Sequence, residues 1–235
     1  MNKAYLFDTE TTGKEEPQIM EAAWVPLLDL PEVGYDLDLS DTYDDSGYVE
    51  RFCTDKPPEL GALAVHHILW EDVKGYRDWK KFKLPEDVGY LVGYNIDYDW
   101  EAACNSGPQP ECKRIDLMSL SRYVWPELDS YKQTAVLYYI SENKKAAQER
   151  AKNAHDAQCD VQIAFEILKA MILELQPESW EQMWEFSEES RIPLIMPFGK
   201  HKGEAIEDVP KDYKKWLLRQ ADVDPYLVKA LENSI

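Results

Sequence analysis

The chain has 235 residues and a formal net charge of -19, with 45 Asp and Glu against 26 Lys and Arg. A hydrophobic content of 44%, with 8 Trp and 14 Tyr, excludes a disordered protein and predicts one full core with a small appendage. So acidic a chain is not a typical nucleic-acid binder, because affinity for polynucleotides comes largely from cations that neutralise phosphates. Any binding to a polynucleotide is therefore expected to be weak, sensitive to salt and non-processive.

The cysteines and the N-terminal segment bear on the cellular compartment. The four cysteines form no C-x-x-C pair, which argues against a zinc knuckle or a redox dithiol and favours reduced thiols. No signal peptide precedes the first predicted strand, and no apolar run approaches the roughly 20 residues of a membrane helix. We expect a cytoplasmic protein without membrane association.

Five strands are predicted from short apolar runs, with turn residues after the first of them. They cover residues 3–8, 19–28, 48–52, 90–94 and 113–118. Residues 29–50 hold eight acids and no Lys or Arg, which predicts a solvated, hairpin-like excursion; the alternative is a surface that mimics nucleic acid.

Helical patterns alternate with the later strands. They cover residues 57–66, a segment behind Asn95 as cap, 120–125, 131–140, 157–175 and a segment after Pro177. Residues 143–153 are polar and predict a mobile loop or a frayed helix. This order of elements predicts an α/β protein with a mixed sheet flanked by helices.

A change of composition near residues 190–195 predicts a domain boundary. Residues 190–235 hold eight Lys or Arg against seven acids, whereas residues 1–189 carry the whole acidic imbalance. We expect a first domain of residues 1–189 and a small, mostly helical C-terminal module of residues 190–235.

Two carboxylates lie two residues apart at the end of the first predicted strand. Asp8 and Glu10 in the run Phe7-Asp-Thr-Glu-Thr-Thr-Gly13 point to the same face, because strand side chains alternate. Like charges this close raise each other's pKa unless a cation lies between them. Mg²⁺ or Mn²⁺ suits ligation by carboxylates alone.

Two further acids and a histidine complete the candidate site. Asp99 falls in the first turn of the helix after residues 90–94, and Asp160 lies on the face of helix 157–175 that should pack on the sheet. His155 lies five residues before Asp160, about 140° away on a continuous helix, so it must lie in the loop or first turn before that helix. An imidazole there can act as general base and take a proton from the attacking water.

Each of these patterns alone has a plainer interpretation. Asp8 could form a turn, Asp99 could stabilise a helix start, and His155 could be a surface histidine. Asp97 and Asp156 are interpreted as non-ligands, and Asp116 is the alternative to Asp99. The joint occurrence of all pieces, in this order and context, favours a two-metal site that cleaves phosphodiesters.

Together these residues resemble the DEDDh branch of the 3′–5′ exonuclease superfamily. The resemblance extends to residues 64–68, to Asp116–Leu128 and to the tail motif Phe198-Gly-Lys-His-Lys-Gly203. It implies a ribonuclease H-like fold with a five-stranded mixed sheet, and hydrolysis of DNA from the 3′ end to 5′-mononucleotides. Asp8, Glu10, Asp99 and Asp160 would bind two Mg²⁺ ions, which Mn²⁺ could replace, and His155 would be the base.

The same resemblance suggests which residues bind the substrate, namely single-stranded DNA or DNA 3′ ends. They are Thr11, His67, Ile68, Asn95, Tyr98, Lys200 and Lys202. For His66 and His67 a packed helix-end histidine is equally compatible, and Lys200 and Lys202 could lie on a plain tight turn. Tyr213 and Trp216 fit the core of the module better than a base-stacking platform. Tyr94 and Tyr98 stand where the family usually has His and Phe.

Two other functions stay open at this point. One is trimming of RNA 3′ ends, since nothing in the sequence reads the 2′-hydroxyl. The other is a non-catalytic, acidic protein that mimics nucleic acid, although such a role would not require four acids and a histidine. DNA repair is among the processes that a 3′–5′ exonuclease would serve.

Overall fold

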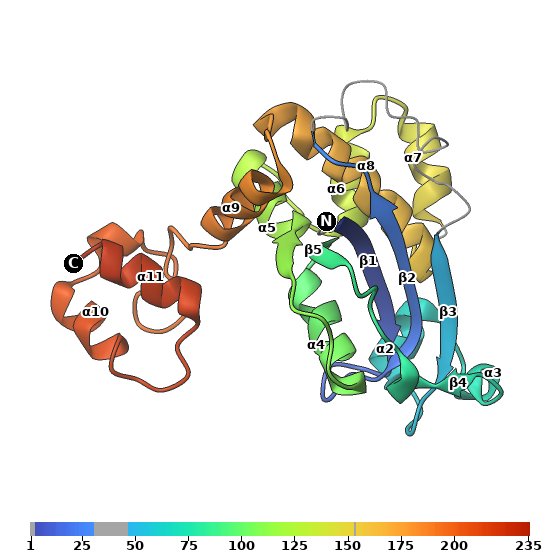
Figure 1. Cartoon of the computed structure of the whole chain (residues 1–235). Helices are drawn as coiled ribbons and strands as arrows, with labels where there is room; N and C mark the ends of the chain where they lie inside the picture. The colour runs from blue at the N-terminus through green and yellow to red at the C-terminus, as the bar shows by residue number, and fades with distance from the viewer. Residues whose placement is uncertain (1–2, 31–46, 153) are drawn as a thin grey trace. The chain divides into compact units, whose positions relative to one another are not determined.

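The computed structural model describes residues 3–30, 47–152 and 154–235. The chain divides into two compact units, Met1–Glu185 and Phe186–Ile235 (Figure 1). Most of the acidic excursion predicted for residues 29–50 lies outside the described residues.

The first unit is built on one mixed sheet with the strand order β4-β3-β2-β1-β5-β6. The strands are β1 (Lys3–Thr11), β2 (Ile19–Leu27), β3 (Tyr48–Cys53), β4 (Arg77–Asp78), β5 (Val88–Gly93) and β6 (Lys113–Asp116). β1 pairs antiparallel with β2 and parallel with β5, and β6 continues the parallel side. All five predicted strands are present. The sixth, β4, has two residues and is too short to leave a pattern in the sequence.

β1 is longer than the sequence predicted. The expected strand ended at Asp8, but pairing with β2 continues through Asp8 with Ala23, Glu10 with Glu21 and Thr11 with Ile19. The partner strand supplies hydrogen bonds that override the low strand propensity of Asp8 and Glu10. Both carboxylates therefore lie on regular strand.

Helices occupy most of the remaining first unit. They are α2 (Leu60–His66), α3 (Trp70–Val73), α4 (Ile96–Ser106), α5 (Leu117–Val124), α6 (Gln133–Ile140), α7 (Lys144–Ala151), α8 (Ala157–Leu175) and α9 (Trp180–Ser190), which crosses the unit boundary. Of the two alternatives predicted for residues 143–153, a mobile loop or a frayed helix, the structure has a helix, α7. Asn143 caps it by accepting from the backbone N–H groups of Lys145 and Ala146, both at 3.1 Å, a local contact that polar composition alone does not reveal.

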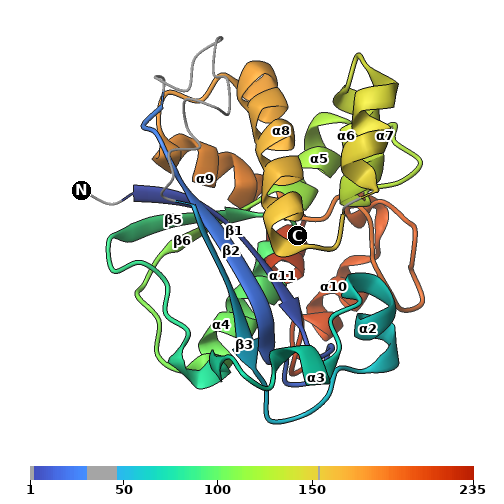
Figure 2. The same ribbon diagram turned by 90° about the vertical axis from the view of Figure 1, so that its right-hand side faces the viewer.

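α4 and α8 cover opposite faces of the sheet (Figure 2). Tyr5 and Phe7 of β1 pack in one buried cluster with Ala102 and Ala103 of α4. The alternate residues of β1 face the other side, where α8 contacts β1 and β2. Asp160, Ala164, Ile167 and Met171, the predicted inner face of α8, are all buried.

The second unit has a small core of its own. It contains a 3₁₀ turn (Ile206–Asp208), α10 (Lys211–Leu217) and α11 (Pro225–Asn233). Its buried residues are Met196, Ile206, Val209, Leu217, Leu227, Ala230 and Leu231. Lys214 is also buried, and its ammonium donates to the carbonyl oxygens of Glu207 and Ser234 at 3.2 and 3.1 Å. Across the described parts of both units, no helix is long and apolar enough to cross a membrane.

Candidate active site

The carboxyl ends of β1 and β5 bring the first three acids together. Asp8 and Glu10 project from the same face of β1, and Glu10 is only 8% exposed. β5 runs parallel to β1 and leads into α4, whose first turn carries Asp99. Because parallel strands end at the same edge of a sheet, Asp99 arrives beside the β1 carboxylates.

Asp99 is buried and held by its neighbour on β1. The backbone N–H and the hydroxyl of Thr9 both donate to Asp99 Oδ1, at 2.9 and 2.6 Å. α4 begins behind Asn95, as predicted, but within the described chain the Asn95 side chain caps no backbone N–H. Asn95 has a left-handed backbone with φ 64°, and its own N–H donates to Asp116 Oδ1 at 3.0 Å.

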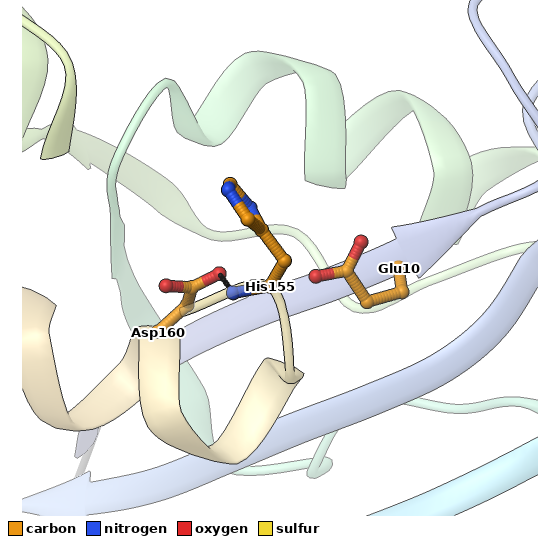
Figure 3. A group of neighbouring side chains, drawn as sticks. All are labelled: Glu10, His155 and Asp160. Atoms are coloured by element: carbon orange, nitrogen blue, oxygen red, sulfur yellow. Dashed lines mark hydrogen bonds between the residues drawn. The ribbon is translucent and has the colours of Figure 1, made fainter. Parts of the chain in front are cut away.

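His155 lies just before α8, where the sequence required it. Its backbone N–H donates to Asp160 Oδ2 at 3.0 Å, and its φ of 76° lies in the left-handed region. Figure 3 shows its side chain rising between Glu10 on β1 and Asp160 on α8. One potential ligand atom from each of these three residues lies within 4.8 Å of the others.

The acids of the cluster resist ionisation when no cation is present. Burial, with the charges of Asp160 and Asp99, raises the pKa of Glu10 to about 9. Burial raises the pKa of Asp8 well above its ordinary value, and the neighbouring acids raise it further. For Asp99 and Asp160 burial raises the pKa to about 7 and about 6, and the hydrogen bonds from Thr9 and from the His155 N–H limit these shifts.

Such a donor set fits hard divalent cations. Burial raises the pKa of all four carboxyl groups, a bound cation would favour their ionised forms, and carboxylate oxygens suit Mg²⁺ or Mn²⁺. Glu10, Asp160 and the His155 ring are close enough to share one ion, and Asp8 and Asp99 interact electrostatically with the same group.

The three neighbouring acids have other contacts. Asp97 forms an ion pair with Arg114, Oδ1 to Nε 2.6 Å. Asp156 caps α8 by accepting from the Cys159 N–H at 3.2 Å. Asp116 caps α5, with its Oδ1 2.9 Å from the Met118 N, and also receives the Asn95 N–H.

A cleft of about 460 Å³ opens beside Glu10. Its lining includes Thr11, Asn95 and Tyr98, three of the predicted substrate-binding residues, together with Glu59 and Gly13. The Tyr98 hydroxyl donates to the Gly13 carbonyl at 2.9 Å and also contacts the Thr11 hydroxyl. Gly13 has a φ of 147°, a backbone conformation that strains any other residue, so this wall favours glycine, and the Glu59 carboxyl group lies against it.

The remaining predicted substrate residues of the first unit differ in exposure. His67 is exposed at the left-handed end of α2. The Ile68 side chain is buried in a small apolar cluster with Met20 and Val73, which the sequence did not reveal. His66 is the packed helix-end histidine: its Nδ1 accepts from the Ile68 N–H at 2.9 Å, and its Nε2 lies 3.1 Å from the Thr11 carbonyl.

Lys200 and Lys202 are exposed on the second unit, in a loop whose two ends lie close together. Tyr213 is half-buried against the core of that unit, as predicted. Trp216 is not a core residue: it is 52% exposed, because Leu217 fills the core position of α10 instead.

One buried carboxylate was absent from the sequence-based site. Glu21 on β2 pairs with Glu10 across the sheet and is 3% exposed. Its Oε1 accepts from Arg51 Nε on β3 at 2.7 Å, and its Oε2 accepts from the Ala157 N–H at the start of α8 at 3.2 Å. An acid within an otherwise apolar strand, Ile19-Met-Glu-Ala-Ala-Trp24, is the signal that could have marked it.

A known protein matches this chain along nearly its whole length. Exodeoxyribonuclease 10 of Escherichia coli K12 is 24% identical over 225 residues, which is 92% of this chain and 91% of that protein. A family model described as a putative quorum-sensing-regulated virulence factor matches residues 190–225.

Solved structures share the fold. Exonuclease X in complex with 5′-overhanging duplex DNA matches with a TM-score of 0.52 and 20% identity, over 78% of this chain and 99% of that chain. E. coli Exonuclease I in complex with a dA16 oligonucleotide matches with a TM-score of 0.55 and 17% identity, over 83% of this chain and 46% of the longer one.

The mixed sheet flanked by helices, together with these matches, defines a ribonuclease H-like α/β protein, as the sequence predicted. Within that class, the chain is similar to exodeoxyribonuclease 10 over nearly the full length of both proteins, and Exonucleases X and I share its fold. The motifs of this chain also resemble those of exodeoxyribonuclease X.

Proposed function

We propose that this protein is a metal-dependent exonuclease that removes 5′-mononucleotides one at a time from DNA 3′ ends. One observation carries the proposal: Glu10, His155 and Asp160, from a strand, a loop and a helix, converge within 4.8 Å beside an open cleft. The named activity of exodeoxyribonuclease 10, which matches along nearly the whole chain, supports the choice of DNA.

Asp8, Glu10, Asp99 and Asp160 would hold two Mg²⁺ ions, which Mn²⁺ could replace. When bound, these ions supply Lewis-acid stabilisation of the charge that develops on the phosphate. Their binding would also lower the raised pKa values of the carboxyl groups, because a cation favours the ionised form. The Thr9 hydrogen bonds keep Asp99 in place for this role.

His155 would be the general base. Its imidazole takes a proton from water, the water oxygen forms a bond to phosphorus, and the bond from phosphorus to the leaving 3′-oxygen breaks. The hydrogen bond from its backbone N–H to Asp160 fixes the residue beside the acids, while its exposed ring stays accessible to water.

The cleft would receive the terminal nucleotide. Its volume of about 460 Å³ lies in the range of small-molecule sites. Thr11, Asn95 and Tyr98 form part of the lining, so the 3′-terminal residue would lie next to Glu10. A pocket for one end needs few phosphate contacts, which is compatible with an acidic chain.

The test is digestion of 5′-labelled single-stranded DNA with Mg²⁺ or EDTA. We expect a ladder that shortens from the 3′ end with Mg²⁺, and no shortening with EDTA or with Asp8→Asn or Asp160→Asn. Asp156→Asn is the matched control, because asparagine also caps helices and the substitution should leave activity near that of the unmodified chain.

Two results would replace this proposal. Faster shortening of a matched RNA oligonucleotide would favour RNA 3′-end trimming. No shortening of either substrate, with a melting temperature that Mg²⁺ leaves unchanged, would favour the acidic, nucleic-acid-mimicking protein.

A further inference from the structure

The second unit carries a chain of three aromatic rings and, in the loop that packs against them, two exposed lysines. The His201 ring meets Tyr213 edge-on at a centroid distance of 4.6 Å, and Tyr213 meets Trp216 at 5.3 Å and 43°. Lys200 and Lys202, on either side of His201 in the chain, are exposed. We call these five residues the aromatic–lysine surface.

The loop that carries the lysines has a defined backbone. Gly199 and Gly203 have φ values of 76° and 88°, and the Lys202 N–H donates to the Gly199 carbonyl at 3.2 Å. A side chain at Gly199 would meet the Tyr213 hydroxyl at 2.6 Å, so glycine lets the loop pack against α10. The loop is therefore anchored on the helix that bears Tyr213 and Trp216.

In this loop one half-buried side chain lies between two exposed ones in the chain. His201 is half-buried, between the Tyr213 ring and the Glu204 carboxylate, with Nδ1 to Oε2 2.9 Å. Lys200 and Lys202, the neighbours of His201 in the chain, are exposed, and so is the Trp216 ring.

Exposed Trp216 is the decisive feature. A single exposed apolar residue needs no explanation. An exposed indole that continues a chain of rings, with two exposed lysines in the loop that packs on that chain, has the composition of a base-stacking site. Aromatic faces accept any base, and lysines contact phosphates as point charges. The acidic first unit offers little attraction for a polynucleotide, which leaves this surface as a better place for such contacts.

We infer that the aromatic–lysine surface binds a single-stranded polynucleotide, with a base stacked on Trp216 and phosphates at Lys200 and Lys202. The choice of ligand rests on the proposed function, but this site is separate from the one that would cleave. It would hold the part of a strand that the cleft for one terminal nucleotide does not contact.

Binding is measured with the full chain in EDTA, where hydrolysis would not occur. The probes are 5′-fluorescein dT15 and U15, followed by fluorescence anisotropy, so that the two arms separate DNA from RNA. For Trp216→Ala we expect the dissociation constant to rise roughly 5- to 150-fold, the range of one base stacked on a ring. Tyr123→Ala, which removes a 55% exposed ring from the first unit, should leave affinity unchanged.

The lysines give an independent measurement that does not depend on Trp216. For Lys200→Gln and for Lys202→Gln, the slope of log affinity against log salt should decrease by about 0.7 each, the value for one phosphate contact on a single strand. Lys229→Gln removes an exposed lysine from α11 and should leave the slope as it is.

A trinucleotide separates this proposal from the proposed function. Trp216→Ala should digest dT3 at the unmodified rate with Mg²⁺, because a substrate so short occupies only the cleft. If none of the variants of this surface changes the affinity for dT15 or U15, the polynucleotide site is overturned, even if dT3 is digested. If these variants lose affinity but neither they nor the unmodified chain digest dT3, the polynucleotide site is upheld and the proposed exonuclease activity is overturned.

Discussion

The Tyr98 hydroxyl is a single group that shapes the wall of the cleft. It donates to the Gly13 carbonyl at 2.9 Å and contacts Thr11, so it joins the first turn of α4 to the loop after β1. A phenylalanine, which the family usually has here, could not make either contact. Tyr98 therefore adds a tie to a loop that Thr12 also holds through its hydrogen bonds with Gln18 and Glu59.

For Tyr98→Phe we expect a loss of about 1 kcal/mol in the free energy of unfolding, the usual net worth of one hydrogen bond. If exonuclease activity is present, KM should rise a few-fold and kcat should change little, because the loop is a wall of the cleft and not a reacting group. Urea unfolding and steady-state kinetics measure both. Tyr139→Phe, at a 52% exposed tyrosine, is the control; an equal effect there would contradict this role.

At the scale of elements, Glu21 joins two strands to the helix of the candidate base. Its carboxylate accepts from Arg51 on β3 and from the Ala157 N–H at the start of α8. His155 and Asp160 belong to that same helix start. The position of α8 over the β1 carboxylates thus depends on a buried charge on β2, on the residue that pairs with Glu10.

For Glu21→Gln we expect a loss of about 2–4 kcal/mol in the free energy of unfolding, because the buried partner groups lose a charged acceptor. Affinity for Mn²⁺, measured by calorimetry, should fall roughly 10- to 100-fold, as for residues that orient metal ligands. Glu50→Gln is the matched control. It breaks the more exposed Glu50–Arg77 pair and should lower the free energy of unfolding by less than about 1 kcal/mol. Unchanged Mn²⁺ affinity in Glu21→Gln would mean that Glu21 serves stability alone.

For the whole molecule, the acidic cluster should make stability depend on pH in an unusual direction. Burial and mutual repulsion raise the pKa of Glu10 to about 9 and that of Asp99 to about 7. In the unfolded chain these groups lose their protons near pH 4, so between about pH 5 and 9 the folded, metal-free protein holds more protons. The free energy of unfolding must then fall as pH rises through this window.

We expect the melting temperature in EDTA to fall from pH 6.5 to pH 9, and Mg²⁺ to raise it more at pH 8.5 than at pH 6.5. At low pH the ion must displace protons from the carboxyl groups, which weakens its binding. Asp8→Asn should flatten the pH dependence, since it removes one repelling charge. Thermal unfolding at these pH values measures all three effects, and a melting temperature that rises with pH in EDTA would contradict the electrostatic account.

The sequence predicted most of the fold because the relevant signals are local. Short apolar runs identified five strands, and the apolar face of α8 placed Asp160 towards the sheet. The sequence left a loop and a frayed helix open for residues 143–153, and the Asn143 cap decides for the helix α7. The predicted end of β1 was wrong, because pairing with the neighbouring strand extends it to Thr11. The roles predicted for the substrate-binding residues stay predictions.

What the sequence determined by itself was the set of chemical groups and their order: the acids, the histidine and the strand or helix that carries each. Residue type and periodicity suffice for that, because they depend on neighbours in the chain. Only the tertiary structure decided that Glu21 supports α8, that Ile68 is interior and that Trp216 is in solvent. Burial and hydrogen-bond partners depend on residues distant in the chain, and one sequence carries no record of which of them meet.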